Sequence, residues 1–198
     1  MTKDRILKVA SIEFSKYGYD GVSMNNLVKK LDINKATVYY HYKDKKSLYI
    51  EVMKTTVTKM NEKTRLIFKE NLEPKEFLYA YIKVYASSIK EMPYLPGLAL
   101  REIASLGADI DESLIPLFDE DVQHLRMALD KLDIKDKYKD IDDYAFHTLI
   151  LGTIFTFYSI QMSHLDVGTK DELKNDEDKS LDYICSFISN LLLDSICK

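Results

Sequence analysis

Residues 23–48 read SMNNLVKKLDINKATVYYHYKDKKSL, and this stretch decides the fold. Four apolar residues that begin with Met24 follow the i, i+3, i+4, i+7 spacing of an amphipathic helix, and Ser23 is placed to cap its N-terminus. The polar turn Asp32–Asn34 comes next, and its last residue can cap a second short helix. Two short helices joined by such a turn predict a helix-turn-helix unit at about residues 24–43.

The sequence on both sides of this unit is also helical in its spacing. Apolar residues from Ile6 to Tyr17 form one stripe, and Gly18 is expected to end that first helix. Asp44 is placed to cap a fourth helix that continues to about Lys69. No convincing run of strand-like alternation occurs in the 198 residues. The sequence therefore predicts an all-α protein.

Charge and spacing together divide the chain into a three-helix head, residues 1–60, and a helical body, residues 61–198. The head carries twelve Lys or Arg against six Asp or Glu, so the overall net charge of −4 hides a head of +6 and a body of −10. A basic head on an acidic body favours a head that meets a polyanion such as nucleic acid. Chance variation among solvated faces is the alternative explanation.

The second helix of a helix-turn-helix unit lies in the major groove of DNA, where about its first two turns reach base edges. Lys35 and His41 can donate to phosphates or guanine acceptors, and Thr37 suits a phosphate or a thymine methyl group. Lys45 and Lys46 come at the start of the fourth helix, where backbone N–H groups and lysines together bind phosphate.

Other residues of the unit are expected to form its core. Val38 and Tyr42 are placed to pack the three helices together. Tyr39 and Tyr40 are ambiguous, because neighbouring positions on a helix point about 100° apart and at most one of the two can be fully buried.

The stretch resembles the signature of the tetracycline-repressor (TetR) family of transcriptional regulators. The resemblance rests on a capped helix, a short turn, the run Thr37–Tyr42, and two lysines at positions 43 and 45 before Leu48. It departs from the family at Asp32, where the family usually has Gly; Asp tolerates the left-handed conformation fairly well. The resemblance implies a dimer that binds a double-stranded DNA operator. The DNA-binding residues that we predict are Ser23, Lys35, Ala36, Thr37, Tyr39, Tyr40, His41, Lys45 and Lys46.

Several body helices are predicted from hydrophobic spacing and breakers. One begins at Glu73-Pro74, a short one covers Leu98–Leu106, and another runs from about Leu114 to Leu132 before a charged loop. The last two helices are expected at about residues 141–164 and 180–196.

Beyond the head the resemblance to the family is architectural. It implies a ligand cavity among the middle helices and a homodimer interface made by the last two helices. Both of those helices are apolar on more than one side, which suits a symmetric four-helix interface. The alternative is that they form the core of a monomer.

Aromatic and methionine side chains are common in the middle of the body, where they can line a pocket for a bulky, mostly apolar effector. Plain core packing is the alternative for each of them. Arg101 and Arg126 are the arginines expected to border the cavity, with an anionic ligand group or Glu102 or Asp130 as partner. The candidate ligand-binding residues are Tyr81, Tyr85, Met92, Phe118, His124, His147, Phe155 and Tyr158.

Other classes of protein fit the sequence less well. The histidines at 41, 124, 147 and 164 lack metal-ligand spacing, and no glycine-rich phosphate loop or nucleophile motif occurs, so neither an enzyme, a metal site nor a cofactor is expected. Residues Tyr144–Ser163 are uncharged over a bilayer's thickness, but their polar side chains and acidic flanks favour a buried helix over a membrane span.

The sequence and its resemblance to the family thus predict a cytoplasmic, ligand-responsive regulator. Repression relieved by a ligand is the usual outcome in that family, so we expect a repressor. No signal peptide is visible, because the N-terminus runs straight into a charged amphipathic helix. A protein that keeps the fold and binds another protein instead of a specific DNA sequence is the alternative. The effector, the operator and the regulated gene are not encoded in any pattern of the sequence.

Overall fold

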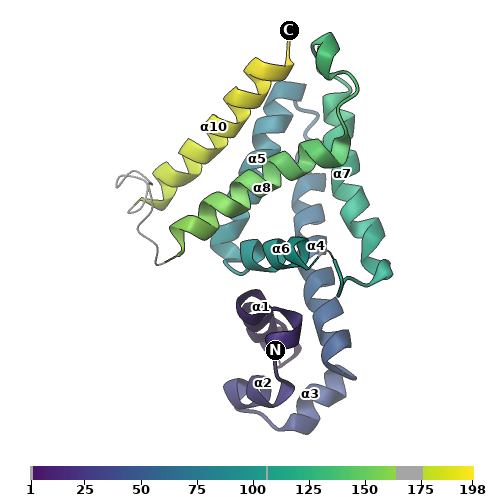
Figure 1. Cartoon of the computed structure of the whole chain (residues 1–198), viewed down its shortest axis with the longest axis vertical. Helices are drawn as coiled ribbons and strands as arrows, with labels where there is room; N and C mark the ends of the chain where they lie inside the picture. Colours follow the sequence, from purple (N-terminus) through teal and green to yellow (C-terminus); the bar gives the residue numbers. More distant parts are fainter. Residues whose placement is uncertain (1, 106, 164–175) are drawn as a thin grey trace.

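The computed structural model describes residues 2–105, 107–163 and 176–198, and these residues form helices joined by short connections (Figure 1). Two residues, Ile134 and Cys197, form an isolated β-bridge within this described part. The helices are α1 Thr2–Gly21, α2 Met24–Leu31, α3 Lys35–His41, α4 Lys45–Lys69, α5 Pro74–Glu91, α6 Leu95–Ala104, α7 Ile115–Leu129, α8 Asp143–Gln161 and α10 Glu177–Ile196, with 3-10 turns at Glu112–Leu114 and Asp136–Tyr138. The all-α prediction is confirmed.

The head contains α1, α2, α3 and the start of α4, gathered at one end of the molecule (Figure 1). Its core is a cluster of buried apolar side chains in which Ile6, Phe14, Leu27, Val38 and Leu48 are almost completely enclosed. These residues come from four helices, so each short helix is held by the others rather than by its own length. Val38 is therefore a core residue, as predicted.

Local capping accounts for the boundaries of the short helices. The Asn34 Oδ1 accepts a hydrogen bond from the Ala36 N–H at 2.9 Å, and the Asp44 carboxylate accepts one from the Ser47 N–H at 2.7 Å. Asp32 adopts the left-handed conformation (φ 48°, ψ 50°), as the turn requires. Ser23 stands at the N-cap position of α2, but its side chain forms no capping hydrogen bond.

The body surrounds α5, against which α4, α7, α8 and α10 pack. Its apolar core includes Leu78, Tyr81, Leu125, Phe146 and Ile150, all nearly inaccessible to solvent. The long α4 extends from the head into this core, and α6 lies between α1 of the head and α8 of the body (Figure 1). The predicted boundary at residues 60 and 61 falls inside α4, and the division into two domains stays a prediction.

The structure corrects three predicted helix boundaries. The short helix begins at Leu95 instead of Leu98, because Pro96 fits in a first turn where no N–H is needed. Gly18 does interrupt the first helix, with φ 71° and ψ 176°, but a further helical turn follows it to Gly21. The helix expected to reach Leu132 ends at Leu129.

The predicted helix of residues 141–164 is observed as α8, Asp143–Gln161, and is capped by the Asp142 side chain. Leu106 and His164, the predicted ends of two helices, lie outside the described residues. Within the described part, no helix is long and apolar enough to span a bilayer.

Candidate nucleic-acid interface and ligand cavity

Helix α3 presents polar and aromatic side chains to solvent at the outer end of the head. Tyr40 is 86% exposed and Tyr39 40%, which resolves the ambiguity between them: neither is buried. The Lys35 ammonium lies 5.6 Å from the centre of the Tyr39 ring, and the Tyr40 ring meets the His41 ring edge-on. The helix thus carries cationic and hydrogen-bonding groups on a rigid, outward-facing surface.

The other predicted DNA-binding residues surround this surface. Ala36 and Ser23 are exposed and Thr37 is half-buried. Lys46 is exposed beside the first turn of α4, whereas Lys45 lies over the Tyr19 ring at 4.4 Å and donates to the Asp20 carbonyl at 3.4 Å. The structure therefore brings all nine predicted residues to α3 and to the helix starts next to it.

Tyr42 differs from its neighbours because its side chain is buried in the head, as predicted. Burial raises the pKa of its hydroxyl to about 12, and that hydroxyl has no hydrogen-bond partner among the described residues. Such a group contributes packing rather than chemistry.

The body contains a cavity of about 390 Å³. Its walls come from α4, α5, α6, α7 and α8, and most of its lining is apolar, including Met53, Met60, Leu98, Phe118 and Phe155. A cavity of this size and character suits a small, mostly apolar molecule.

One buried carboxylate organises the polar part of the cavity. Tyr81 and Tyr85 on α5 both donate to the Asp121 Oδ2, the former at 2.6 Å, and the His147 Nε2 lies 2.9 Å from the same oxygen. Burial alone would raise the pKa of Asp121, but the hydrogen bonds from His147 and the two tyrosines outweigh it and lower that pKa. The second oxygen, Oδ1, has no partner among the described residues.

Two further acceptors line the same cavity without a partner among the described side chains and backbone. Glu102 on α6 is only 8% exposed, and its Oε2 is unpaired. Burial, and secondarily the nearby Asp109 carboxylate, raise the pKa of Glu102. Asn61 on α4 donates through Nδ2 to the Leu117 carbonyl at 2.8 Å, which leaves its Oδ1 as a free buried acceptor.

Half of the predicted ligand-binding residues line this cavity and half do not. Tyr85, Phe118, His147 and Phe155 contribute to its wall. Among the others, Tyr81 reaches it only through Asp121, and the His124 ring instead packs against Phe68 at 5.2 Å. Met92 and Tyr158 belong to the core around α5 without lining the cavity.

Asp121 and Asn61 were not predicted from the sequence, and Glu102 was expected only as a partner for an arginine. A signal for Asp121 was present, because it lies on the same helical face as Phe118 and Leu125, three and four residues away. A carboxylate within an apolar stripe is expensive unless it is paired or functional. Asn61 had a weaker signal, because the four residues that follow it, 62–65, are all polar.

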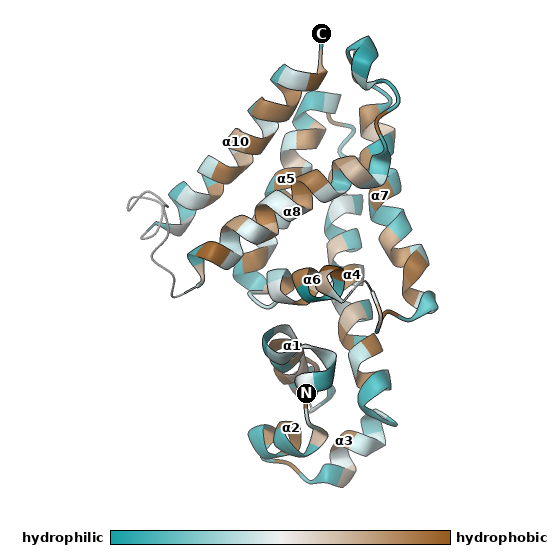
Figure 2. Cartoon of the chain, viewed as in Figure 1, coloured by the Kyte–Doolittle hydropathy of each residue, from teal (hydrophilic) through white to brown (hydrophobic). Residues whose placement is uncertain are grey.

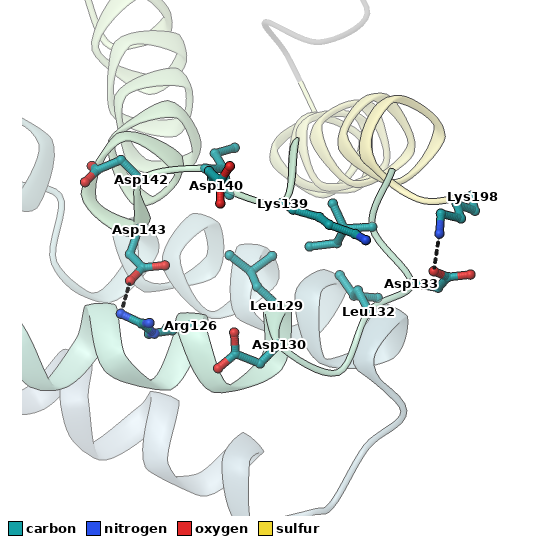
Figure 3. Close-up of a pocket in the computed structure, with 12 residues that line it drawn as sticks. Arg126, Leu129, Asp130, Leu132, Asp133, Lys139, Asp140, Asp142, Asp143 and Lys198 are labelled. Carbon is teal, nitrogen blue, oxygen red and sulfur yellow. Dashed lines mark hydrogen bonds and ion pairs between the residues drawn. The ribbon is translucent and has the colours of Figure 1, made fainter. Parts of the chain in front are cut away.

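The two arginines do not line this cavity as expected. Arg126 forms an ion pair with Asp143 at 2.9 Å and borders a separate, charged hollow of about 630 Å³ (Figure 3). Lys198 pairs with Asp133 at 3.2 Å in the same hollow. Two ion pairs therefore lie within the wall of this hollow, and Arg126 is engaged in one of them.

Arg101 instead joins α6 to the head. Its guanidinium donates from Nε to the Ser15 carbonyl at 2.7 Å and from Nη2 to the Lys16 carbonyl, near the end of the first part of α1. The two helices approach so closely that a Cβ at Gly97 would lie 3.1 Å from the Ser15 carbonyl oxygen. Because α6 also lines the cavity, a change in the cavity can reach α1 through one helix.

Helices α8 and α10 carry an exposed apolar stripe. Figure 2 shows hydrophobic turns along both helices. On α10, Tyr183, Phe187 and Leu191 follow an i, i+4, i+8 spacing, and Leu191 is 55% exposed; Leu149 and Ile160 on α8 are also exposed. The Tyr183 ring packs between Phe157 of α8 and Phe187. A large exposed apolar patch is typical of an interaction surface.

Residues 6–52 match the model of the family described as bacterial regulatory proteins, tetR family. The biofilm operon icaADBC HTH-type negative transcriptional regulator IcaR of Staphylococcus aureus is 27% identical over 130 residues, which cover 60% of this chain and 70% of IcaR.

Solved structures match over nearly the whole chain. The TetR family regulator PfmR from Thermus thermophilus superposes with a TM-score of 0.70 at 20% identity, over 97% of this chain and 98% of PfmR. AibR, in complex with isovaleryl coenzyme A and operator DNA, gives a TM-score of 0.68 at 16% identity, over 94% of this chain and 97% of AibR. Residues 6–52 thus match the TetR family of transcriptional regulators, and the helical body that follows them completes the fold of these solved regulators.

Proposed function

We propose that this chain is a repressor that binds a palindromic operator as a homodimer and is released from it by a small, largely apolar effector. The dual role of α6 carries the proposal: its residues line the cavity, and Arg101 on its outer side holds α1 of the head. An effector that prefers one position of α6 would then shift the spacing of the two heads and lower operator affinity.

The exposed surface of α3 supports the DNA-binding part of the proposal. Lys35, Thr37 and Tyr40 are accessible without rearrangement of the head, and capping by Asn34 and Asp44 fixes the helices that present them. Two such heads on one dimer would occupy major-groove faces about one helical turn, or a small multiple of it, apart.

The stripe on α8 and α10 supports the homodimer. A two-fold axis would place the α8 and α10 of one copy against those of the other, which covers Leu149, Phe187 and Leu191 in a four-helix contact. Each of these three side chains is already about half buried in one copy, so covering it would contribute roughly half of the 1.5–3 kcal/mol that full burial of a leucine or phenylalanine gives.

The relatives support repression and effector binding. IcaR is described as a negative regulator, and AibR was solved with both an acyl coenzyme A and operator DNA. This chain would likewise bind DNA through its head and an effector through its body. Its effector would be set by the residues that line its own cavity.

Selection of bound fragments from the source genome, followed by fluorescence anisotropy on the best fragment, tests the proposal. Lys35→Ala and Tyr40→Ala should each weaken specific binding by about 1–3 kcal/mol, or roughly ten- to hundredfold. The control Lys131→Ala removes an exposed lysine of the body and should leave affinity unchanged.

A lack of preference over random duplex, with no effect of either head substitution, would refute operator recognition. It would favour the protein-binding alternative, which capture of a defined partner by the body would then have to support.

A further inference from the structure

The cavity in the body is lined by buried hydrogen-bond acceptors that have no donor. The three buried polar atoms that line it without a partner in the described structure are the Asn61 Oδ1, the Glu102 Oε2 and the Asp121 Oδ1. All three are acceptors. A ligand that satisfies them must bring donors, because two acceptors brought together in a buried site remain unpaired.

The charge of the lining has one sign. Two carboxylates, Glu102 and Asp121, line the cavity, and the described part of its wall contains no lysine or arginine. The cationic form of His147 would compensate Asp121, to which it is hydrogen bonded, and would still leave Glu102 without an opposite charge. Buried charges are paired or costly, so an apolar cavity with an excess carboxylate favours a cation.

The rest of the wall is aromatic or aliphatic. Tyr85, Phe118 and Phe155 present rings, and Met53, Met60 and Leu98 present aliphatic or thioether groups. Aromatic faces attract cations by about 0.5–2 kcal/mol and accept apolar chains equally well. Apolar walls of this kind supply no ligands for a metal ion. Within the described residues, no group of three or more His, Cys, Asp or Glu side chains could hold a metal ion.

We infer that the effector of this protein is a protonated amine on an apolar body, with its N–H groups directed to the buried acceptors Glu102, Asp121 and Asn61. This inference rests on the proposed effector-binding role of the cavity and names the chemical class. The unpaired acceptors distinguish a protonated amine from a quaternary ammonium ion, because the latter has no N–H to donate. They also disfavour carboxylates and phosphates, which repel the two acids.

Four ligands with the same octyl chain test the head group alone. Isothermal titration of the full-length protein at pH 7 would compare octylammonium, octyltrimethylammonium, octanol and octanoate. We expect octylammonium to bind at least about tenfold more tightly than octanol and octyltrimethylammonium, since these two leave buried acceptors of the cavity unpaired. Octanoate should bind most weakly.

Variants locate the effect in the cavity. Glu102→Gln should reduce the preference for octylammonium over octanol by roughly tenfold while leaving octanol affinity unchanged. Asp121→Asn should reduce the same preference. The control Glu112→Gln removes an exposed acid outside the cavity and should change nothing.

Octanol, octanoate or octyltrimethylammonium binding as tightly as octylammonium would overturn the inference, as would a complete lack of octylammonium binding. The comparison on the unaltered protein decides the matter even if a cavity variant fails to fold. Operator anisotropy is measured separately: intact operator binding with a failed amine preference overturns only the ligand class, whereas lost operator preference overturns only the DNA-binding role.

Discussion

Replacing Arg101 with alanine removes the side chain that links α6 of the body to α1 of the head. In the structure its guanidinium donates to the Ser15 and Lys16 carbonyls. Those carbonyls lie just before the break at Gly18, where the regular helical pattern of α1 is interrupted and a cation is favoured by the helix dipole. The substitution should therefore loosen the head from the body without touching the core of either.

The size of the effect follows from the number of hydrogen bonds and their exposure. A hydrogen bond to a charged group contributes about 1.5–3 kcal/mol when buried. Arg101 is exposed, and exposed charged contacts contribute only about 0.2–1 kcal/mol each. Two bonds from one planar donor should together stabilise the fold by about 0.4–2 kcal/mol.

Urea unfolding at pH 7 measures this loss. The protein concentration is held fixed, because the midpoint of the proposed dimer would depend on it. With a denaturant slope of about 2 kcal/mol per molar, the midpoint should fall by about 0.2–1 M. The matched control is Arg126→Ala, which removes one exposed ion pair with Asp143 and should cost less than about 1 kcal/mol. An Arg101→Ala midpoint equal to that of the unaltered protein would refute the claim that Arg101 joins the head to the body.

Three further substitutions test other features. Gly18→Ala should destabilise the fold by about 1–3 kcal/mol in thermal unfolding, because φ 71° with ψ 176° is a conformation that only glycine adopts easily. The control Gly152→Ala, inside α8 with open space around it, should be neutral or stabilising. Leu191→Lys should raise the dimer dissociation constant about 100-fold or more in sedimentation experiments, and the similarly exposed Leu66→Lys should not; a dimer that tolerates both contradicts the proposed interface. Asp44→Ala should lower the urea midpoint at pH 7. Backbone hydrogen bonding holds the pKa of Asp44 below its ordinary value of 3.8, so this stabilisation is present above that value and disappears as the pH falls through the lower, folded-state pKa; a difference between the two proteins that persists in strong acid would contradict the capping role.

The head could be predicted almost residue by residue because its signals are local. The caps at Asn34 and Asp44, the left-handed turn at Asp32 and the buried Val38 each follow from residues within four positions in the chain. Helix starts and turns depend on such short-range chemistry. The predicted start of α6 is wrong because proline is compatible with two positions. It interrupts the interior of a helix, but it is also accepted in the first turn, where Pro96 lies.

The cavity was harder to predict because its wall comes from five helices. Asn61, Glu102 and Asp121 lie far apart in the sequence, and periodicity places each on a helix face without saying which faces meet. The aromatic and methionine residues were predicted together as candidates for the wall, and packing separates them: Tyr85 and Phe155 line the cavity, whereas Met92 belongs to the core around α5.

The position of the buried acids suggests how an effector would act on DNA binding. Glu102 faces the cavity from α6, and its neighbour in sequence, Arg101, holds the carbonyls of α1. Consecutive residues on a helix point about 100° apart, so a small rotation of α6 that turns Glu102 toward a bound cation must also move the Arg101 guanidinium. Interfaces of this kind have discrete alternative packings rather than a continuum, so a small rotation can favour a different position of the head. Arg101→Ala should then weaken the effect of octylammonium on operator affinity, even where the variant still binds both the amine and the operator. Fluorescence anisotropy of the operator with and without octylammonium would measure this effect.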